Sequence, residues 1–210
     1  AAMARSYNPG MLVVDRTVTG EFENYTTPEQ ELPNKPLPYP WETCMTMGNS
    51  WSYVPNDEYK SSTKLVHTLI KIVCRGGNLL LNIGPGPDGD WDPVAYERLK
   101  DIGNWMSINQ EAIHATKPVA PYSEGNIFYT QSKDGKVIYA HYLLDNANSI
   151  LPATITLNNL PISKKPAVSL FGSKLKPAVS FSGSTVVIKT GAGMQKSFGG
   201  SPAAVFKIVL

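Results

Sequence analysis

Hydrophobic positions in the first half of the chain switch between strand-like and helix-like patterns. Residues 11–14 are a short continuous apolar run, and residues 78–83 contain the apolar run Leu79–Leu81; such runs are typical of buried strands. Residues 42–47 fit a further strand. Residues 61–75 and 93–113 repeat apolar side chains at helical spacing, which predicts two amphipathic helices. Continuous apolar strands separated by helices predict a parallel sheet with helices on both faces.

The second half shows strand patterns and no helical period. Residues 126–131 and 137–143 flank Lys133-Asp134-Gly135, which is a hairpin signal. Further short strands are predicted at 153–157, 167–170, 185–189 and 203–209. Several short strands with turn residues between them predict an antiparallel β-sandwich of roughly 90 residues. The expected fold class is therefore α/β plus all-β.

Charge divides the chain near Lys117. Residues 1–117 carry a net charge of −4 and residues 118–210 a net charge of +6, and all 4 tryptophans lie in the first part. The dividing stretch contains Pro118 and Pro121, which is typical of a linker. We therefore predict an α/β domain over residues 1–117 and a β-sandwich domain over residues 118–210.

Composition excludes several classes of protein. The 210 residues are 42% hydrophobic and 17% charged, with a net charge of +2, so a disordered chain is excluded. Neither the net charge nor the scattered lysines favour a nucleic-acid partner. No apolar run is long enough for a membrane span, and residues 1–4 show no signal-peptide pattern. The chain has only two cysteines, Cys44 and Cys74, which excludes a disulfide framework.

The first predicted strand ends on Asp15-Arg16. In α/β barrels the catalytic groups lie where the strands end, at the carboxyl face. The planar guanidinium of Arg16 is suited to holding a substrate hydroxyl or a carboxylate. The alternative is a structural ion pair at the end of a strand.

Acidic residues crowd the loop that follows. One of them becomes a general acid if burial or a neighbouring charge raises its pKa. The alternative is a solvated acidic loop. The candidates are Glu21, Glu23, Glu29 and Glu31.

Aromatic residues surround the second predicted strand: Trp41, Trp51 and Tyr53. Aromatic faces stack on sugar rings through dispersion contacts with C–H groups. The alternative for each is ordinary packing in the core.

No motif indicates a metal ion or a cofactor. Residues 88–92 begin like a calcium loop, but its sixth and twelfth positions are Pro93 and Leu99 instead of Gly and Glu. The histidines have no partner at metal-ligand spacing and are His67, His114 and His141. We expect structural roles for them, and no cofactor.

Taken together, the motifs resemble the α-L-fucosidases of glycoside hydrolase family 29, in matching order across residues 5–117. They are residues 13–18, 20–29, 40–44, 50–53 and 76–85. The resemblance implies that residues 1–117 are the C-terminal part of a (β/α) barrel, and that the sandwich is the C-terminal domain of the family. It also implies retaining hydrolysis of terminal α-L-fucose from a fucosylated glycan or glycoside.

Three residue roles follow from the resemblance. Arg16 resembles the arginine that contacts the sugar and supports the nucleophile side. Glu29, in the Thr-Pro-Glu motif, resembles the acid/base, with Asp15, Glu23 and Glu42 as alternatives. Trp51 resembles the aromatic residue that packs against the C5 methyl group of fucose.

The family's nucleophile, an aspartate on an earlier strand, has no counterpart here, and its position would precede Ala1. A partial barrel exposes sheet edges that must be covered. We therefore expect a complementary chain or a homo-oligomer, and a secreted, periplasmic or lysosomal location as in the family. The alternative function is a non-catalytic carbohydrate-binding or assembly module derived from a fucosidase.

Overall fold

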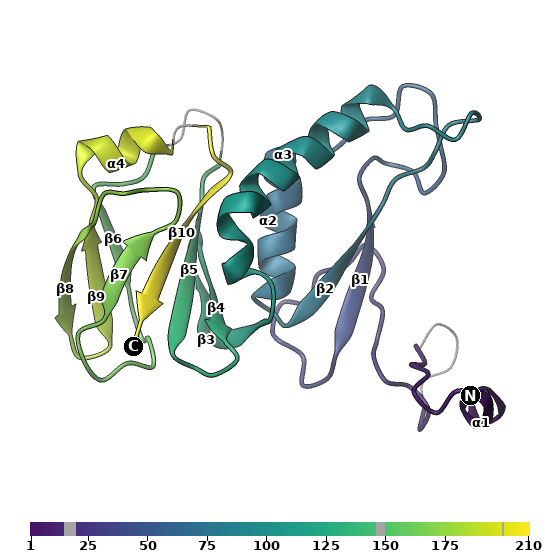
Figure 1. Cartoon of the computed structure of the whole chain (residues 1–210), viewed down its shortest axis with the longest axis horizontal. Helices are drawn as coiled ribbons and strands as arrows, with labels where there is room; N and C mark the ends of the chain where they lie inside the picture. Colours follow the sequence, from purple (N-terminus) through teal and green to yellow (C-terminus); the bar gives the residue numbers. More distant parts are fainter. Residues whose placement is uncertain (15–19, 146–149, 199) are drawn as a thin grey trace.

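The computed structural model describes residues 1–14, 20–145, 150–198 and 200–210. Within them, an α/β part is followed by two antiparallel sheets (Figure 1). No helix in these ranges is long and apolar enough to cross a membrane.

The α/β part is built on a pair of parallel strands. Its elements are β1 (Trp41–Thr46), α2 (Ser62–Val73), β2 (Gly77–Asn82), α3 (Pro93–Asn109) and the 3-10 turn η1 (Gln110–Ala112). The prediction of two strands and two helices between residues 42 and 113 is confirmed, with ends shifted by a few residues. The hydroxyl of Ser61 accepts a 3.2 Å hydrogen bond from the Lys64 amide and so caps α2.

The prediction of a buried strand over residues 11–14 is wrong. Met11 and Leu12 are exposed, and Val14 forms only an isolated parallel bridge with Tyr25. A strand needs a neighbour along its length, and the pairing described for this run is the Val14–Tyr25 bridge and a hydrogen bond from the Asn24 amide to the carbonyl of Val13. The preceding helix α1 (Ala2–Tyr7) buries no residue.

Helices do not cover both faces of the parallel pair. Both α2 and α3 pack on one face, where Leu81 joins a buried cluster with Met47 and Leu65. Leu80 points the other way and is 49% exposed. No helix in the described ranges packs against that second face, so this part of the prediction is wrong.

The predicted antiparallel sandwich is confirmed. One sheet has the order β3-β4-β5-β10-β7 and the other β6-β9-β8, with antiparallel pairing throughout. The elements are β3 (Thr116–Glu124), β4 (Ile127–Ser132), β5 (Val137–Leu143), β6 (Thr154–Leu157), β7 (Ala167–Leu170), β8 (Ala178–Ser182), β9 (Thr185–Lys189), α4 (Ala192–Ser197) and β10 (Ala203–Val209). Their inward side chains form one core, which includes Tyr129, Leu157, Ile188 and Phe206.

Residues 117–121, expected as a linker, lie within strand β3. A proline removes a ladder donor, but β3 is at the edge of its sheet, where Pro118 and Pro121 are tolerated. The pairing of β3 with β4 shifts register between Pro118 and Ser123. The domain division at residue 117 stays a prediction.

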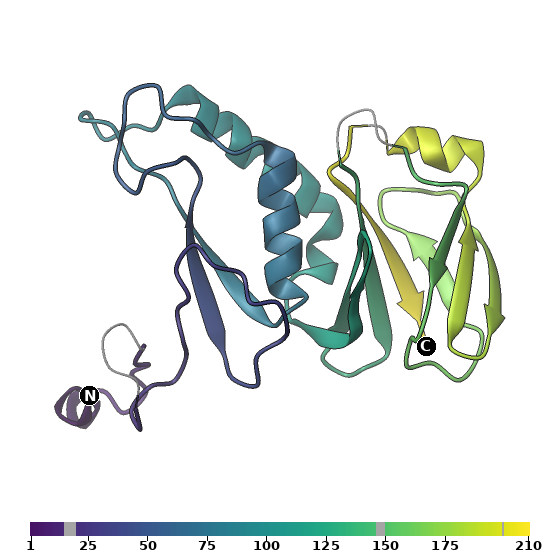
Figure 2. The same cartoon turned by 180° about the vertical axis from the view of Figure 1, so that it is seen from behind.

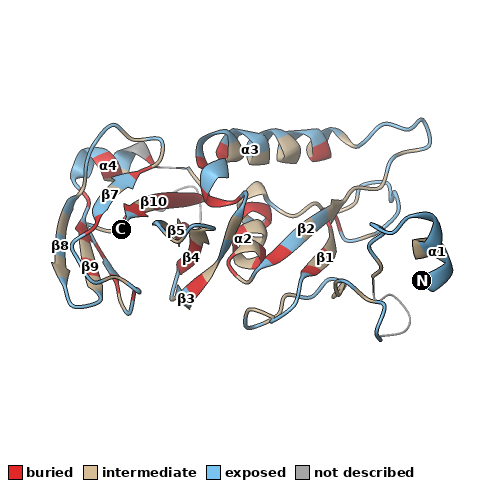
Figure 3. Ribbon diagram, turned by 60° about the horizontal axis from the view of Figure 1, so that its bottom comes forward, coloured by how far each residue is buried: buried red, intermediate tan, exposed pale blue. Residues whose placement is uncertain are grey.

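Helices α2 and α3 lie between the parallel pair and the five-stranded sheet (Figures 1 and 2). A shared buried cluster joins Ile70 of α2 and Trp105 of α3 to Phe128 and Val205 of the sheet, and Figure 3 shows the buried positions at this junction. The Trp105 indole N–H donates a 3.1 Å hydrogen bond to the carbonyl of Ala203. The sandwich therefore holds the helices that support the parallel pair.

Candidate functional site

The loops that follow β1 and β2 meet at the carboxyl ends of these parallel strands. The Met47 amide donates a 2.9 Å hydrogen bond to the carbonyl of Asn82, and the Lys60 amide donates to the carbonyl of Met47 at 2.9 Å. The Asn82 side-chain amide donates to the carbonyl of Trp51 at 2.8 Å. Both ends of the loop over residues 47–60 are therefore tied to the end of the sheet.

Lys60 reinforces the start of this loop. Its ammonium group donates hydrogen bonds of 2.6 Å and 2.7 Å to the carbonyls of Thr46 and Gly48. Burial, and next the positive charge of Lys64, lower the pKa of Lys60, while Asp57 opposes them. The half-buried ammonium group of Lys60 therefore holds the loop in place. The sequence did not predict this role, because no motif marks the residue.

Asp57 shapes the same loop from within. Its carboxylate accepts hydrogen bonds from the backbone amides of Asn49, Ser50 and Glu58. A β-carbon on Gly48 would collide with this carboxylate, so the close approach requires glycine.

The loop presents Trp51 on the surface, where 40% of the residue is exposed. Tyr53 is equally exposed at 40%. Trp41, by contrast, is 1% exposed and its indole N–H donates a 3.2 Å hydrogen bond to the carbonyl of Arg75. Of the aromatic residues proposed as sugar platforms, Trp41 is thus a core residue, and the role of Trp51 stays a prediction.

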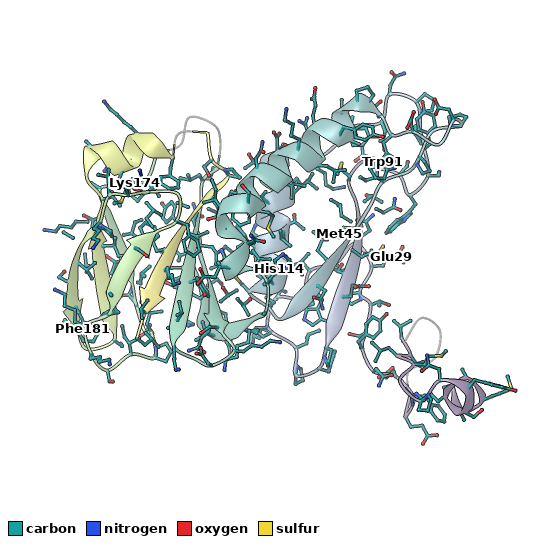
Figure 4. The ribbon with its side chains drawn as sticks, viewed as in Figure 1. Glu29, Met45, Trp91, His114, Lys174 and Phe181 are labelled. Carbon is teal, nitrogen blue, oxygen red and sulfur yellow. The ribbon has the colours of Figure 1, made fainter. Side chains whose placement is uncertain are left out.

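Glu29 lies on a segment that runs beside β1, on the side away from β2. Residues 26 and 29 form parallel bridges with Trp41 and Cys44, and the Gln30 amide donates a 3.0 Å hydrogen bond to the carbonyl of Cys44. Glu29 itself is exposed, and Figure 4 shows it beside Met45 of β1. The segment therefore brings this carboxylate toward the end of β1 from which the Trp51 loop emerges.

The other acidic candidates lie in different surroundings. One Glu23 carboxylate oxygen accepts a 3.4 Å hydrogen bond from the Gly20 amide, within its own turn. Glu42 is half-buried in β1, and Glu21 and Glu31 are exposed. None of these positions follows β1 or β2 directly.

Arg16 and Asp15 lie outside the described residues, so their predicted roles stay predictions. A neighbouring arginine that the sequence did not single out does have contacts. The Arg5 guanidinium donates hydrogen bonds of 2.6 Å to the side-chain oxygen of Asn24 and 2.7 Å to the carbonyl of Phe22. Arg5 thus anchors helix α1 to the loop that precedes Glu29.

His67 and His141 contact other residues of the protein, and His114 is exposed. A ring nitrogen of His67 is 2.8 Å from the carbonyl of Pro202. The Nε2 atom of buried His141 is 3.0 Å from the Thr130 hydroxyl. Over the described ranges, no group of three or more His, Cys, Asp or Glu side chains could hold a metal ion.

The described residues therefore bring together an exposed carboxylate beside β1 and exposed aromatic faces after it, on loops fixed to the sheet. Such a surface can donate a proton to, and stack against, a bound sugar. A retaining glycosidase also needs a nucleophilic carboxylate, and none is identified at this site among the described residues.

Comparison with known proteins places the chain in a family. A family model described as alpha-L-fucosidase matches residues 1–111. The alpha-L-fucosidase of Branchiostoma floridae is 36% identical over 181 residues, which cover 81% of this chain and 39% of that protein. The plasma alpha-L-fucosidase of Homo sapiens is 36% identical over 126 residues, or 57% of this chain and 27% of that protein. The chain thus spans well under half the length of these relatives.

Solved structures show the same fold. Alpha-L-fucosidase isoenzyme 1 from Paenibacillus thiaminolyticus superposes with a TM-score of 0.84 at 24% identity, covering 100% of this chain and 52% of that one. The Thermotoga maritima alpha-fucosidase in complex with a mechanism-based inhibitor gives a TM-score of 0.80 at 26% identity, covering 100% and 48%. The likeness extends over the α/β part and the sandwich alike.

Proposed function

Because this chain belongs to the α-L-fucosidase family, we propose that it supplies the acid/base side of a retaining α-L-fucosidase site. The substrate class is a glycoconjugate or glycoside that ends in α-L-fucose. The supporting observation is the placement of two exposed side chains at β1. Glu29 lies on the segment bridged to its edge, and Trp51 lies on the loop that follows it.

In this proposal Glu29 acts twice. It first donates its proton to the glycosidic oxygen as the bond to the fucose C1 atom breaks. It then takes a proton from the water that hydrolyses the fucosyl-enzyme intermediate. Retaining enzymes of this kind hold the acid/base and the nucleophile carboxyl groups about 5–5.5 Å apart, so the nucleophile must come within this distance of Glu29.

Trp51 and Arg16 position the sugar. The exposed indole of Trp51 offers an apolar face for the C5 methyl group of fucose. The Arg16 guanidinium orients a sugar hydroxyl and favours the negative charge of the nucleophile. Neither residue takes part in bond breaking, so both act by holding the reacting atoms in line.

The nucleophile is supplied by a complementary chain, a second copy or further residues of a longer protein. Exposed apolar side chains support association with such a further part of the barrel. Leu80 is 49% exposed on the uncovered face of the parallel pair, and Leu12 is 71% exposed near the N-terminal helix. Exposed apolar surface next to an open strand edge favours association. An extracytoplasmic location is proposed from relatives such as the plasma enzyme.

The test is release of fucose from an aryl α-L-fucoside by the purified 210-residue chain, with its mass in solution measured on the same sample. We expect release by an assembly heavier than one chain, and loss of release in Glu29→Gln. Release that persists unchanged in Glu29→Gln would overturn the proposal, and so would release by a single chain, because the nucleophile would then lie within it. A folded chain without release lacks the nucleophile in that sample, and its binding of fucose would be the mark of a carbohydrate-binding module.

A further inference from the structure

The aromatic surface at the carboxyl end of the parallel strands extends well beyond Trp51. Tyr53, Trp91 and Tyr96 are 40%, 36% and 49% exposed. The Trp91 and Tyr96 rings contact each other with centroids 5.5 Å apart and planes tilted by 46°. Trp91 lies where the loop after β2 leads into α3 (Figure 4). Large aromatic faces left open to solvent in one place indicate a binding surface.

Tyr53 and Trp91 both line a cavity of about 400 Å³. Its wall also includes Pro87 and the acidic residues Asp88 and Asp90. This volume lies within the range of small-ligand sites, roughly 300–1,000 Å³. Aromatic faces combined with carboxylate oxygens match a pyranose ring, whose C–H faces stack and whose hydroxyl groups donate hydrogen bonds.

The cavity wall is held in place before any ligand arrives. The Gly86 amide donates a 2.7 Å hydrogen bond to the carbonyl of Asp90, and the Gly89 amide donates to the carbonyl of Gly86 at 3.0 Å. A β-carbon on Gly84 would lie 2.5 Å from the backbone of Ser52 and Tyr53, so the loop after β2 packs tightly on the loop after β1. Binding here loses little conformational entropy.

We propose that this cavity binds the sugar residue to which the fucose is attached. Tyr53 and Trp91 stack on its ring, and Asp88 and Asp90 accept hydrogen bonds from its hydroxyl groups. The proposal rests on the proposed fucosidase function and extends it from the fucose to the adjoining sugar. Continuity supports this occupant, because Tyr53, which lines the cavity, lies two residues after Trp51 on the same fixed loop.

Substrate discrimination tests the proposal in the active assembly. We compare kcat/KM for 2′-fucosyllactose, in which the fucose is attached to lactose, with kcat/KM for 4-nitrophenyl α-L-fucoside. Trp91→Ala should lower the ratio of the two values about tenfold, the scale expected for losing one aromatic stacking contact. Trp91→Phe should restore most of the ratio. Tyr39→Ala is the matched control, because Tyr39 is 47% exposed but precedes β1 at its opposite end.

Binding of lactose tests the same cavity without any turnover. Saturation-transfer NMR on the 210-residue chain should detect lactose at millimolar concentration, and the signal should be lost in Trp91→Ala and kept in Tyr39→Ala. No transfer to lactose in the wild-type chain, or equal transfer in Trp91→Ala, would overturn the proposal. Failure of the fucosidase function has a different signature, in which lactose binds but no fucose is released.

Discussion

The side-chain amide of Asn82 donates a 2.8 Å hydrogen bond to the main-chain carbonyl of Trp51. Asn82 is the last residue of β2, and its own carbonyl accepts a hydrogen bond from the Met47 amide at the end of β1. One residue therefore joins two strand ends to the loop that presents the exposed indole.

Removing this amide should loosen Trp51. We expect Asn82→Ala to lower the free energy of unfolding by about 1 kcal/mol, the usual net value of one hydrogen bond. Acrylamide should then quench tryptophan fluorescence more strongly than in the wild-type chain. Asn104→Ala, at an exposed position of α3, is the control and should leave the quenching unchanged. Unchanged quenching in Asn82→Ala would show that other contacts fix the loop.

The acid role of Glu29 predicts a dependence on the leaving group. Glu29→Gln should reduce turnover of an alkyl α-L-fucoside by about 100-fold or more, the scale of general acid catalysis. The first step on a 4-nitrophenyl fucoside should be spared, because that leaving group needs no proton. Pre-steady-state release of nitrophenol measures this step. Glu31→Gln, two residues further along the same exposed segment, is the control, and equal losses on both substrates in Glu29→Gln would remove Glu29 from the acid role.

Two glycine substitutions should have opposite effects on stability. Gly84→Ala should destabilise the chain, because the added β-carbon would meet the backbone of Ser52 and Tyr53 at 2.5 Å. Gly103→Ala should stabilise it by up to about 1 kcal/mol, because Gly103 lies inside helix α3 and a β-carbon there meets nothing within 4 Å. Urea unfolding of both variants measures the two effects. Similar urea midpoints for the two variants would show that the loop after β2 accommodates the added β-carbon with no loss of stability.

Acid should destabilise the fold through His141. Burial lowers the pKa of His141 to about 3, and its Nδ1 atom has no hydrogen-bond partner among the described residues. The unfolded chain binds this proton near pH 6.5, so stability is full above that value and falls as the pH drops from about 6.5 toward 3. Urea midpoints between pH 7 and pH 4 should fall less in His141→Gln than in the wild-type chain. The control is His114→Gln at an exposed position, and its urea midpoint should fall with pH as in the wild-type chain. If the midpoint fell equally in all three proteins, His141 would not be the cause of the acid sensitivity.

The sequence pattern predicts those elements whose periodicity agrees with their burial. Helix α2 follows this rule, because its buried residues Leu65, Val66, Ile70 and Ile72 recur at helical spacing. The prediction for residues 11–14 failed because apolar character alone does not supply a neighbouring strand. Strand β3 was missed because its prolines are typical of a linker, and only its place at a sheet edge makes them compatible with a strand.

The sequence predicts some parts of the candidate site and not others. Sequence motifs alone indicate Glu29 and Trp51, because their neighbours along the chain carry the family resemblance. The contacts that fix the loops join residues distant in sequence, such as Lys60 with Thr46 and Asn82 with Trp51. The cavity beside Trp91 likewise depends on two loops meeting, and no local pattern in the sequence specifies that meeting.

Strand β10 follows every other described strand along the chain, yet it lies between β5 and β7 and not at an edge of its sheet. It also carries Ala203, the hydrogen-bond acceptor of Trp105. Helices α2 and α3 are therefore synthesised before the last strand of the cluster that buries them. A premature stop codon before Ala203 would remove Ala203 and Val205 from that cluster and would leave part of it open to proteolysis.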